Sequence, residues 1–266
     1  TGRGLNIKAQ VLPRPVGFLL SHALTLNPFY STPTYEALSK LPFEQRIAEM
    51  RKPEVRAKIL SESNDPDPKN KLGLRVRNFN DMFPLGEPPN YEPPAETSIL
   101  AQSHARGVTP EELVYDLLLE RDGRNILFLA AANYADKNLD SAVEMVAHED
   151  TVLGLGDGGA HLGTVCDATY TTSMLLEWPK ARSGGRRMDL AGTIRELSRR
   201  PAELMGFMDR GLIKPGLRAD LNLIDLDRLH LRRPEIVVDL PAGGRRLMQK
   251  AEGYVATYVN VEAIQR

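Results

Sequence analysis

The residues most able to take part in a chemical reaction lie in one short stretch, TVLGLGDGGAHLG, at positions 151–163. A β-branched apolar segment leads into glycines, and the stretch carries Asp157 and His161. The spacing G-x-G-x-x-G, which begins at Gly154, matches the phosphate-binding fingerprint of dinucleotide sites. Glu177 lies about as far downstream as a ribose-binding acid should. The other interpretation is that Asp157 itself is the reactive group.

The dinucleotide interpretation conflicts with the residues around the motif. Asp157 would lie inside the phosphate loop, where its carboxylate repels a pyrophosphate. Glu177 occurs in MLLEWPKA, whose pattern is helical, whereas the ribose-binding acid follows a strand. The motif also comes late, with no complete βαβαβ unit after it. A lone glycine fingerprint is weak support, so a dinucleotide-binding protein is the third of our interpretations.

Two roles of Asp157 stay open. Barrels of alternating strands and helices keep their catalytic residues just past the C-terminal ends of parallel strands, which is where this acid is expected. Gly158 and Gly159 carry no side chain, so a metal, a water or a substrate can approach their backbone closely. We therefore predict that these two glycines contact substrate. The alternative is that Asp157 only caps the following turn.

Histidines and one arginine are the candidate partners of this acid. The five histidines include no His-x-His pair and lie at positions 22, 104, 148, 161 and 230. His161 follows Asp157 in the same loop, so it is predicted to orient substrate or to hydrogen-bond the acid. His22, after the apolar stretch VGFLL, is the next candidate. Arg14, between two prolines, can hold a substrate carboxylate by a bidentate pair or form a structural ion pair.

Composition excludes several classes of protein. The net charge of −1 indicates neither a nucleic acid nor a membrane surface as partner. The single cysteine, Cys166, excludes an intramolecular disulfide and a Cys-rich zinc site, and we expect it to be a small buried thiol. The apolar runs are shorter than the roughly 20 residues of a membrane span, and no signal peptide is visible. We expect a cytoplasmic protein of ordinary globular composition.

The first part of the chain is predicted to hold two strands and a long excursion. IKAQV and VGFLL have the pattern of short buried strands on either side of LPRP. Residues 28–100 are rich in proline, with SNDPDPKNKLG and PLGEPPNYEPP predicted as loops. Within them, PFEQRIAEMRKPEVRAKILSES is spaced for a helix interrupted near Pro53. We expect this excursion to have no core of its own.

The pattern changes after residue 108. Thr109, Pro110 and Glu112 form the start signal of a helix that ends at Gly123. The strand NILFLAAAN, the helix LDSAVEMVAHE and the strand TVLGLG follow, which indicates an α/β fold with parallel pairing. DLAGTIRELSRRPAELMG adds helical turns, and short strands separated by turns fill the chain after residue 207.

Three stretches resemble the C-terminal part of the amidohydrolase superfamily, and within it the D-aminoacylase or N-acyl-D-amino-acid deacylase type. They are GLGDGGAHLGTVCDATY, DLAGTIRELSRRPAELMGFMDRGLIKPGLRADLNLIDLDRL and DLPAGGRRLMQKAEGYVATYVN. The resemblance implies the C-terminal part of a (β/α)₈ TIM-type barrel over residues 1–207, with the long excursion at 28–100, followed by a small β-sandwich unit over residues 208–266. It also implies zinc, with Asp157 facing the metal and carrying the proton in amide hydrolysis.

Much of the family's ligand set has no match in this sequence. The family expects a His-x-His pair, a bridging Cys, Lys or Glu and further histidines after middle strands. We therefore expect the C-terminal segment of a deacylase, inactive as an isolated chain, that self-associates or pairs with a second chain completing the barrel. The alternative is a non-catalytic scaffold or assembly module that keeps GDGGAH for its turn geometry.

Overall fold

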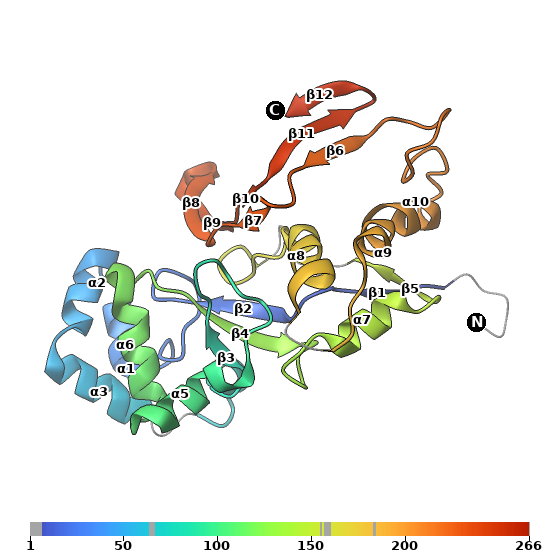
Figure 1. The fold of residues 1–266 in the computed structure, drawn as a ribbon. Helices are drawn as coiled ribbons and strands as arrows, with labels where there is room; N and C mark the ends of the chain where they lie inside the picture. Colours follow the sequence, from blue (N-terminus) through green and yellow to red (C-terminus); the bar gives the residue numbers. More distant parts are fainter. Residues whose placement is uncertain (1–6, 64–66, 155, 157–160, 183–184, 266) are drawn as a thin grey trace.

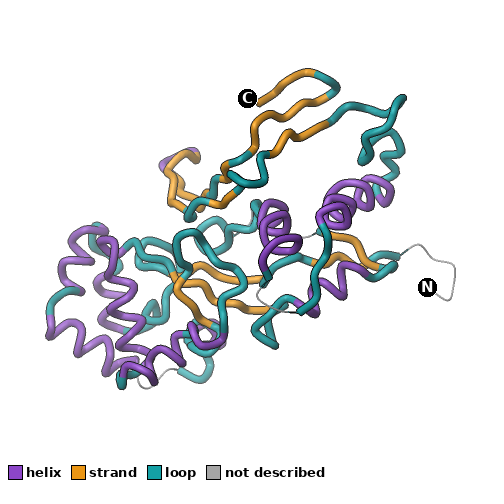
Figure 2. The backbone as a smooth tube through the Cα atoms, in the orientation of Figure 1, coloured by secondary structure: helices purple, strands orange, loops and turns teal. Residues whose placement is uncertain are grey.

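The computed structural model describes residues 7–63, 67–154, 156, 161–182 and 185–265. Asp157, Gly158 and Gly159 lie outside the described residues. A cluster of helices forms one end of the molecule, short strands run through its middle, and a second group of helices covers the other end (Figures 1 and 2). The chain after residue 207 forms a separate set of strands above these elements. The architecture is a mixed α/β fold.

Two small sheets form the middle of the molecule. Strand β1 (Ala9–Val11) pairs with β5 (Thr151–Leu153) in parallel. Strand β4 (Leu127–Ala132) lies between β2 (Val16–Leu20) and β3 (Met82–Pro84) and is antiparallel to both. The four strands expected from the sequence are confirmed as β1, β2, β4 and β5. The expected parallel pairing is confirmed for β1 and β5 and is wrong for β4.

Strands β2 and β4 pack closely against each other in this antiparallel register. A Cβ atom on Gly17 would lie 2.2 Å from Cε2 of Phe128, so the strand accepts only glycine there. The strands assigned among the described residues form sheets of two and three strands, and they do not close into a barrel. The barrel therefore stays a prediction from the family resemblance.

The proline-rich excursion folds into short helices. They are α1 (Pro33–Leu38), α2 (Phe43–Met50), α3 (Pro53–Ser63), α4 (Lys71–Arg75), the 3₁₀ turn η1 (Ala95–Thr97) and α5 (Ile99–Arg106). The interruption expected near Pro53 is confirmed, because α3 begins at that residue. Helix α4 lies partly in a stretch expected to be a loop, and Asn70 caps it by accepting a hydrogen bond from the Gly73 N–H.

The helices of the excursion share one apolar core with the rest of the fold. Phe29, Met50 and Ile59 pack with residues of β2, β4 and helix α6 (Pro110–Gly123) in a single cluster. As expected, the cluster is not confined to residues 28–100. These helices are therefore held in place by long-range burial rather than by their own propensity, which is weak for such short segments.

Helix α6 begins as its sequence predicts, but its backbone leaves the helical conformation at Glu120 (ψ 161°), three residues before the expected stop at Gly123. The Glu112 N–H donates to Oγ1 of Thr109, and the Glu112 carboxylate accepts from the Thr109 N–H, which completes the capping box. Gly123 has φ +76°, and a Cβ atom there would lie 2.4 Å from Cδ1 of Ile47. The glycine therefore permits both the left-handed turn and the close approach of α2.

Removing the capping box should weaken this helix measurably. We expect Thr109→Ala to lower the free energy of unfolding by about 1 kcal/mol, because the first-turn N–H groups lose their acceptor. Urea unfolding followed by far-UV circular dichroism measures this loss. Ser61→Ala is the control, since this exposed serine lies inside α3 and should change stability by less than about 0.5 kcal/mol. Equal effects of the two substitutions would contradict the capping role.

The second helical group contains the expected helices with wider turns between them. Its elements are α7 (Asp140–Ala147), α8 (Tyr170–Leu176), η2 (Glu177–Ala181), α9 (Leu190–Ile194), η3 (Arg195–Arg199) and α10 (Arg200–Leu204). Pro201 lies at the start of α10, as predicted. Trp178, the single tryptophan, is fully buried beneath this group, and its indole N–H donates to the Pro13 carbonyl at 3.1 Å. None of the described helices is long and apolar enough to cross a membrane.

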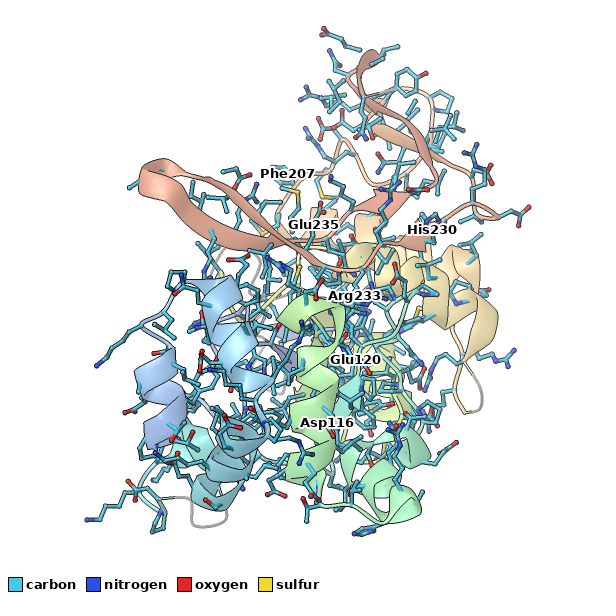
Figure 3. The ribbon with its side chains drawn as sticks, turned by 90° about the vertical axis from the view of Figure 1, so that its left-hand side faces the viewer. Asp116, Glu120, Phe207, His230, Arg233 and Glu235 are labelled. Atoms are coloured by element: carbon cyan, nitrogen blue, oxygen red, sulfur yellow. The ribbon has the colours of Figure 1, made fainter. Side chains whose placement is uncertain are left out.

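The C-terminal part consists of short strands, as expected. They are β6 (Leu221–Ile224), β7 (His230–Leu231), β8 (Glu235–Leu240), β9 (Gly244–Met248), β10 (Ala251–Glu252), β11 (Tyr254–Val259) and β12 (Glu262–Gln265), with the turn η4 (Pro241–Gly243). Leu231 and Leu247 join the core of the main body. Arg233 donates to the Asn125 side chain at 2.7 Å and lies between the β8–β9 ribbon and the end of α6 (Figure 3). The β unit is thus docked by both apolar and polar contacts.

Candidate functional site

Three segments that follow strand ends meet at one place. Because β1 and β5 are parallel, their C-terminal ends are adjacent, and the Gly154 N–H donates to the Val11 carbonyl at 3.1 Å. Asn133, directly after β4, donates its side-chain amide to the Leu12 carbonyl at 3.3 Å. The segment that contains Arg14 and the segment from Gly154 to Gly163, called the glycine loop below, therefore begin at the same edge of the fold. This is the edge at which α/β proteins place ligands.

Asn133 was not among the residues singled out from the sequence. Its φ of +60° lies in the left-handed region, which asparagine tolerates better than most residues. The signal available in the sequence was a polar residue directly after the apolar strand LFLAAA. Because its amide spans the gap to the segment after β1, Asn133 ties two of the three converging segments together.

The glycine loop leaves β5 and returns along β2. Gly156 is packed closely, since a Cβ atom there would lie 3.1 Å from both the Asp167 Cβ and the Tyr170 ring. Later in the loop, the Thr164 carbonyl accepts a hydrogen bond from the Leu19 N–H of β2 at 2.7 Å. The chain thus follows the edge of β2 that β4 leaves free. Asp157 belongs to this loop, and its predicted role is a proposal considered below.

His161 forms a turn in the returning part of the loop. Its φ is +51°, and its carbonyl accepts from the N–H groups of Thr164 and Val165 at 2.8 and 3.0 Å. The side chain is exposed. Next to this turn, the Thr25 N–H donates to the Gly163 carbonyl at 3.2 Å. The backbone of His161 shapes the loop, while its imidazole is accessible to a ligand.

Arg14 is buried in a polar cluster beside the loop. It is 2% exposed, and its Nη2 lies 2.5 Å from both Oδ1 of Asp167 and the Cys166 carbonyl oxygen. The guanidinium carbon lies 4.2 Å from the centre of the Tyr91 ring. Of the two predicted roles, the ion pair is therefore present in this structure. The Nε–H of Arg14 is buried and has no hydrogen-bond partner among the described residues.

Glu177 is a further member of this cluster. The sequence suggested it only as a ribose-binding acid, but it follows α8 on a helical turn and not a strand. This placement counts against the dinucleotide interpretation. Its Oε2 is buried without a hydrogen-bond partner in the described part of the chain. Burial raises the pKa of Glu177 to about 8, and Glu92 adds to the rise while Arg14 and Arg182 oppose it.

A second arginine balances the other acids around Glu177. Arg182 has a fully buried side chain that donates to Glu92 at 2.8 Å and to Asp140 at 2.6 Å. Arg14 thus pairs with Asp167, Arg182 pairs with Glu92 and Asp140, and a fourth carboxyl, Glu177, lies near both arginines. In a region of low dielectric, the fourth group is best accommodated in its protonated form. The signal in the sequence was a lone acid in the apolar run MLLEW.

Cys166 is a buried thiol, as predicted. Burial raises its pKa to about 11, with Asp167 adding to the rise and Arg14 opposing it. We expect 5,5′-dithiobis(2-nitrobenzoate) to label the folded protein on the order of 100-fold more slowly than free cysteine at pH 8, because little thiolate forms. Labelling in 6 M guanidinium chloride is the control and should be fast. Fast labelling of the folded chain would contradict the buried position.

His22 is the one buried histidine of the five, all of which are described. It follows β2 and is 1% exposed, and neither ring nitrogen has a hydrogen-bond partner among the described residues. Burial, and then the charge of Arg46, lower its pKa to about 3, so the imidazole is neutral at pH 7. The Arg46 guanidinium donates to the His22 carbonyl at 2.7 Å. A neutral imidazole with free nitrogens can act as a ligand or a base.

The described residues alone do not make a metal centre. No group of three or more His, Cys, Asp or Glu side chains among them could hold a metal ion. Of the remaining histidines, His104, His148 and His230 are exposed, and His230 faces Glu252 in the β unit at 3.3 Å. The expected metal-facing acid, Asp157, falls outside the described residues.

Comparison with known proteins adds a family to this geometry. The family model described as "Amidohydrolase family" matches residues 117–261. The match covers more than half of the 266 residues and runs from α6 through β4, β5 and the glycine loop to β11. No curated protein and no solved structure matches the chain significantly. The matched region contains β4, β5 and the glycine loop, and the chain belongs to the amidohydrolase family.

Proposed function

We propose that the chain is the C-terminal segment of a metal-dependent amidohydrolase that cleaves the amide bond of N-acyl amino acids. Membership of the amidohydrolase family supports a hydrolase, and this family generally uses metal ions. The D-aminoacylase type and its D-configured substrates rest on the resemblance of the three C-terminal stretches. The observation that carries the proposal is the meeting of the glycine loop, Arg14 and Asn133 at one strand edge, inside a fold of this family.

Each residue has a proposed role in amide hydrolysis. Asp157 takes a proton from the attacking water and delivers it to the leaving nitrogen, as a general base and then a general acid. The backbone of Gly158 and Gly159 contacts the substrate. His161, whose side chain is exposed beside the loop, orients it. The free Nε–H of Arg14 attracts the substrate carboxylate.

Zinc is the proposed metal, with Asp157 as the residue that faces it. A carboxylate is a suitable zinc ligand, and neutral imidazole is another. His22 supports this assignment, because its ring nitrogens are buried without partners in the described structure and its pKa is lowered to about 3. The other ligands are proposed to come from a second chain or from a preceding half of the protein.

The same proposal gives the chain a partner. We propose a partial barrel over residues 1–207 and a β unit over residues 208–266, completed by self-association or by a second chain. The sheets of two and three strands support this, because their outer strands carry backbone groups that can pair with another chain. Size-exclusion chromatography with light scattering tests it. A monomer at high protein concentration would contradict self-association.

Metal content separates the hydrolase from the scaffold alternative. We expect about one zinc per chain by elemental analysis, and its loss in Asp157→Asn with an unchanged melting temperature. Asp136→Asn is the matched control, since this exposed acid lies in another loop and should retain the zinc. Hydrolysis of N-acetyl-D-amino acids and of their L-enantiomers is then measured in the zinc-loaded protein.

The scaffold alternative has one observation in its favour. The buried Arg14–Asp167 pair stabilises the site region without any ligand, so the loop can be kept for its geometry alone. Loss of folding in Asp157→Asn would support this alternative and contradict the catalytic role of Asp157, whereas a zinc-free chain would mean that the zinc ligands lie on the preceding half of the protein. Zinc that binds equally to wild type and Asp157→Asn would contradict the role of Asp157.

A further inference from the structure

A hollow of about 420 Å³ lies between α4 and the end of β4. None of its lining residues belongs to the glycine loop or to the segment of Arg14, so the two places are distinct. Strand β3 pairs with β4 only as far as Leu129, and the next contact is the Ala130 N–H, which donates to the Asp81 carbonyl at 2.9 Å. Beyond that point Arg75 of α4, rather than a residue of β3, donates to β4 at the Ala131 carbonyl. The volume of the hollow is within the range of small-molecule sites.

Two cations line this hollow without acidic partners. Lys71 and Arg75 lie one helical turn apart on α4, so their side chains share a face. Neither forms an ion pair with any acid in the described ranges. By contrast, Arg77, just past the helix, is paired with Glu111 at 2.7 Å. The positive charge in the hollow is therefore not neutralised by the chain itself.

The nearest acid is already neutralised. Asp81, beside the hollow, forms an ion pair with Lys137 and accepts hydrogen bonds from Asn78 and Asn80. Its charge is therefore largely balanced by the lysine. An anion in the hollow meets the side-chain amide of Asn78 and two cations rather than an unpaired carboxylate.

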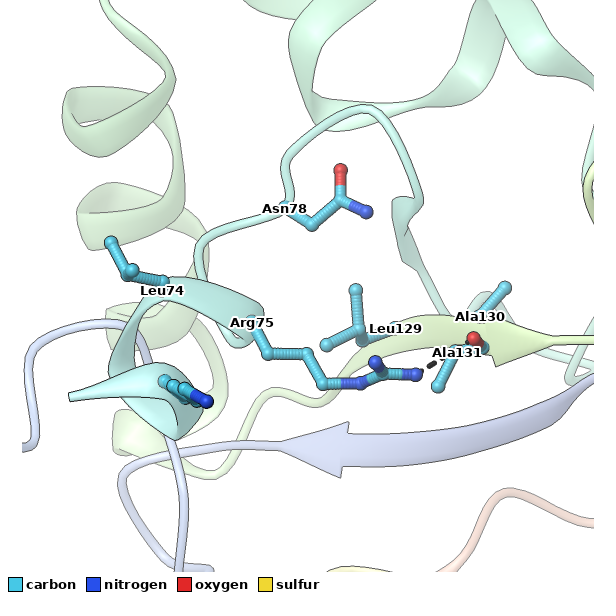
Figure 4. A pocket seen from close by; sticks show the side chains of 7 residues that line it. Leu74, Arg75, Asn78, Leu129, Ala130 and Ala131 are labelled. Carbon is cyan, nitrogen blue, oxygen red and sulfur yellow. Dashed lines mark hydrogen bonds between the residues drawn. The ribbon is translucent and has the colours of Figure 1, made fainter. Parts of the chain in front are cut away.

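Arg75 is held in place before any ligand arrives. Its Nη2 donates to the Ala131 carbonyl at 2.8 Å, and the side chain extends along β4 toward that residue (Figure 4). Its Nε–H and Nη1 make no hydrogen bond within the described part of the chain. A guanidinium fixed at one nitrogen loses less conformational entropy on binding an oxyanion. Leu74 and the half-buried Ala131 provide apolar walls on the same hollow.

We propose that this hollow binds a small aliphatic carboxylate. The carboxylate accepts hydrogen bonds from Arg75 and lies beside the ammonium group of Lys71, and its hydrocarbon chain contacts Leu74 and Ala131. The combination of a fork-shaped donor, a second cation and apolar walls favours a carboxylate with a short chain over an inorganic anion. The site does not depend on the proposed hydrolase activity, because it shares no residue with the glycine loop.

Isothermal titration of the full chain with hexanoate tests this site. We expect saturable binding that weakens about tenfold in Lys71→Gln and in Arg75→Gln, since each removes one charge-assisted interaction. Lys69→Gln removes an exposed charge just before α4, outside the hollow, and should bind as the wild type does. Arg75→Lys should bind with intermediate affinity, because it keeps the charge but loses the fork.

Three further probes make the result decisive. Acetate and phosphate should bind more weakly than hexanoate, and hexylamine should not bind. Absence of hexanoate binding at millimolar concentration, or equal weakening in Lys69→Gln, would overturn the site. Phosphate binding as tightly as hexanoate would overturn the carboxylate assignment. Circular dichroism of each variant verifies folding, and Lys71→Gln keeps the test valid if Arg75→Gln unfolds, because no hydrogen bond of the Lys71 side chain to a described residue is lost.

Discussion

Arg14→Gln is expected to lower the free energy of unfolding by about 3–5 kcal/mol. The arginine is 2% exposed, and the substitution leaves Asp167 as a buried carboxylate without its cation. The Cys166 carbonyl also loses its donor, and the contact with the Tyr91 ring is lost. Removing one partner of a buried pair is costly, because the remaining charge keeps its desolvation penalty. Urea unfolding, followed by Trp178 fluorescence and by circular dichroism, measures the change.

A surface pair provides the matched control. Arg56 forms two hydrogen bonds of 3.0 Å with Asp116, but its side chain is 34% exposed and that of the acid 61%. Arg56→Gln should therefore cost no more than about 1 kcal/mol. If Arg14→Gln does not fold, Arg14→Met combined with Asp167→Leu recovers stability, because both charges are then absent. A loss for Arg14→Gln as small as that for Arg56→Gln would show that the buried pair is not a determinant of stability.

Glu177→Gln is expected to stabilise the protein at pH 8 and to flatten its pH dependence. Burial raises the pKa of Glu177 from 4.5 to about 8, so the folded protein retains this proton where the unfolded chain has released it. Stability should therefore fall as pH rises through this window, by about 1.4 kcal/mol for each pH unit. Below pH 4.5 both states are protonated and the effect is absent. Glutamine has the shape of the protonated acid but does not titrate.

The measurement is the free energy of unfolding of both proteins at pH 5, 6, 7 and 8. The gain of Glu177→Gln over wild type should be smallest at pH 5 and largest at pH 8. Glu36→Gln is the control, since this exposed residue of α1 should leave the pH dependence unchanged. Parallel stability curves for wild type and Glu177→Gln would show that the carboxyl is ionised in the folded protein.

Local elements of the fold could be predicted from short stretches of sequence. The capping box of Thr109 and Glu112 and the break at Pro53 both depend on residues within a few positions of each other. The strands at 127–132 and 151–153 were visible as short apolar runs. The short helices α1, α4 and α5 and the strand β3 were missed, because so few residues give too weak a periodic or capping signal.

Pairing and burial could not be predicted in the same way. Strand β4 was expected to be parallel to its neighbours, but its partners are chosen by contacts such as Phe128 against Gly17, more than a hundred residues apart in the chain. Arg14 and Asp167 are separated by 153 positions, so the choice between a substrate-binding and an ion-paired arginine required their distance in space. Glu177 became a candidate only when its neighbours were known.

The amino-acid sequence by itself determined the family, the glycine loop with Asp157 and His161, and most helices and strands. These follow from motifs and periodicity, in which the interacting residues are close along the chain. Only the tertiary structure decided that Arg14 is paired, that Glu177 and His22 are buried, and that Asn133 joins the strand edge. The physical reason is that ionisation and hydrogen bonding depend on the dielectric and the partners around a group. Distant segments supply both.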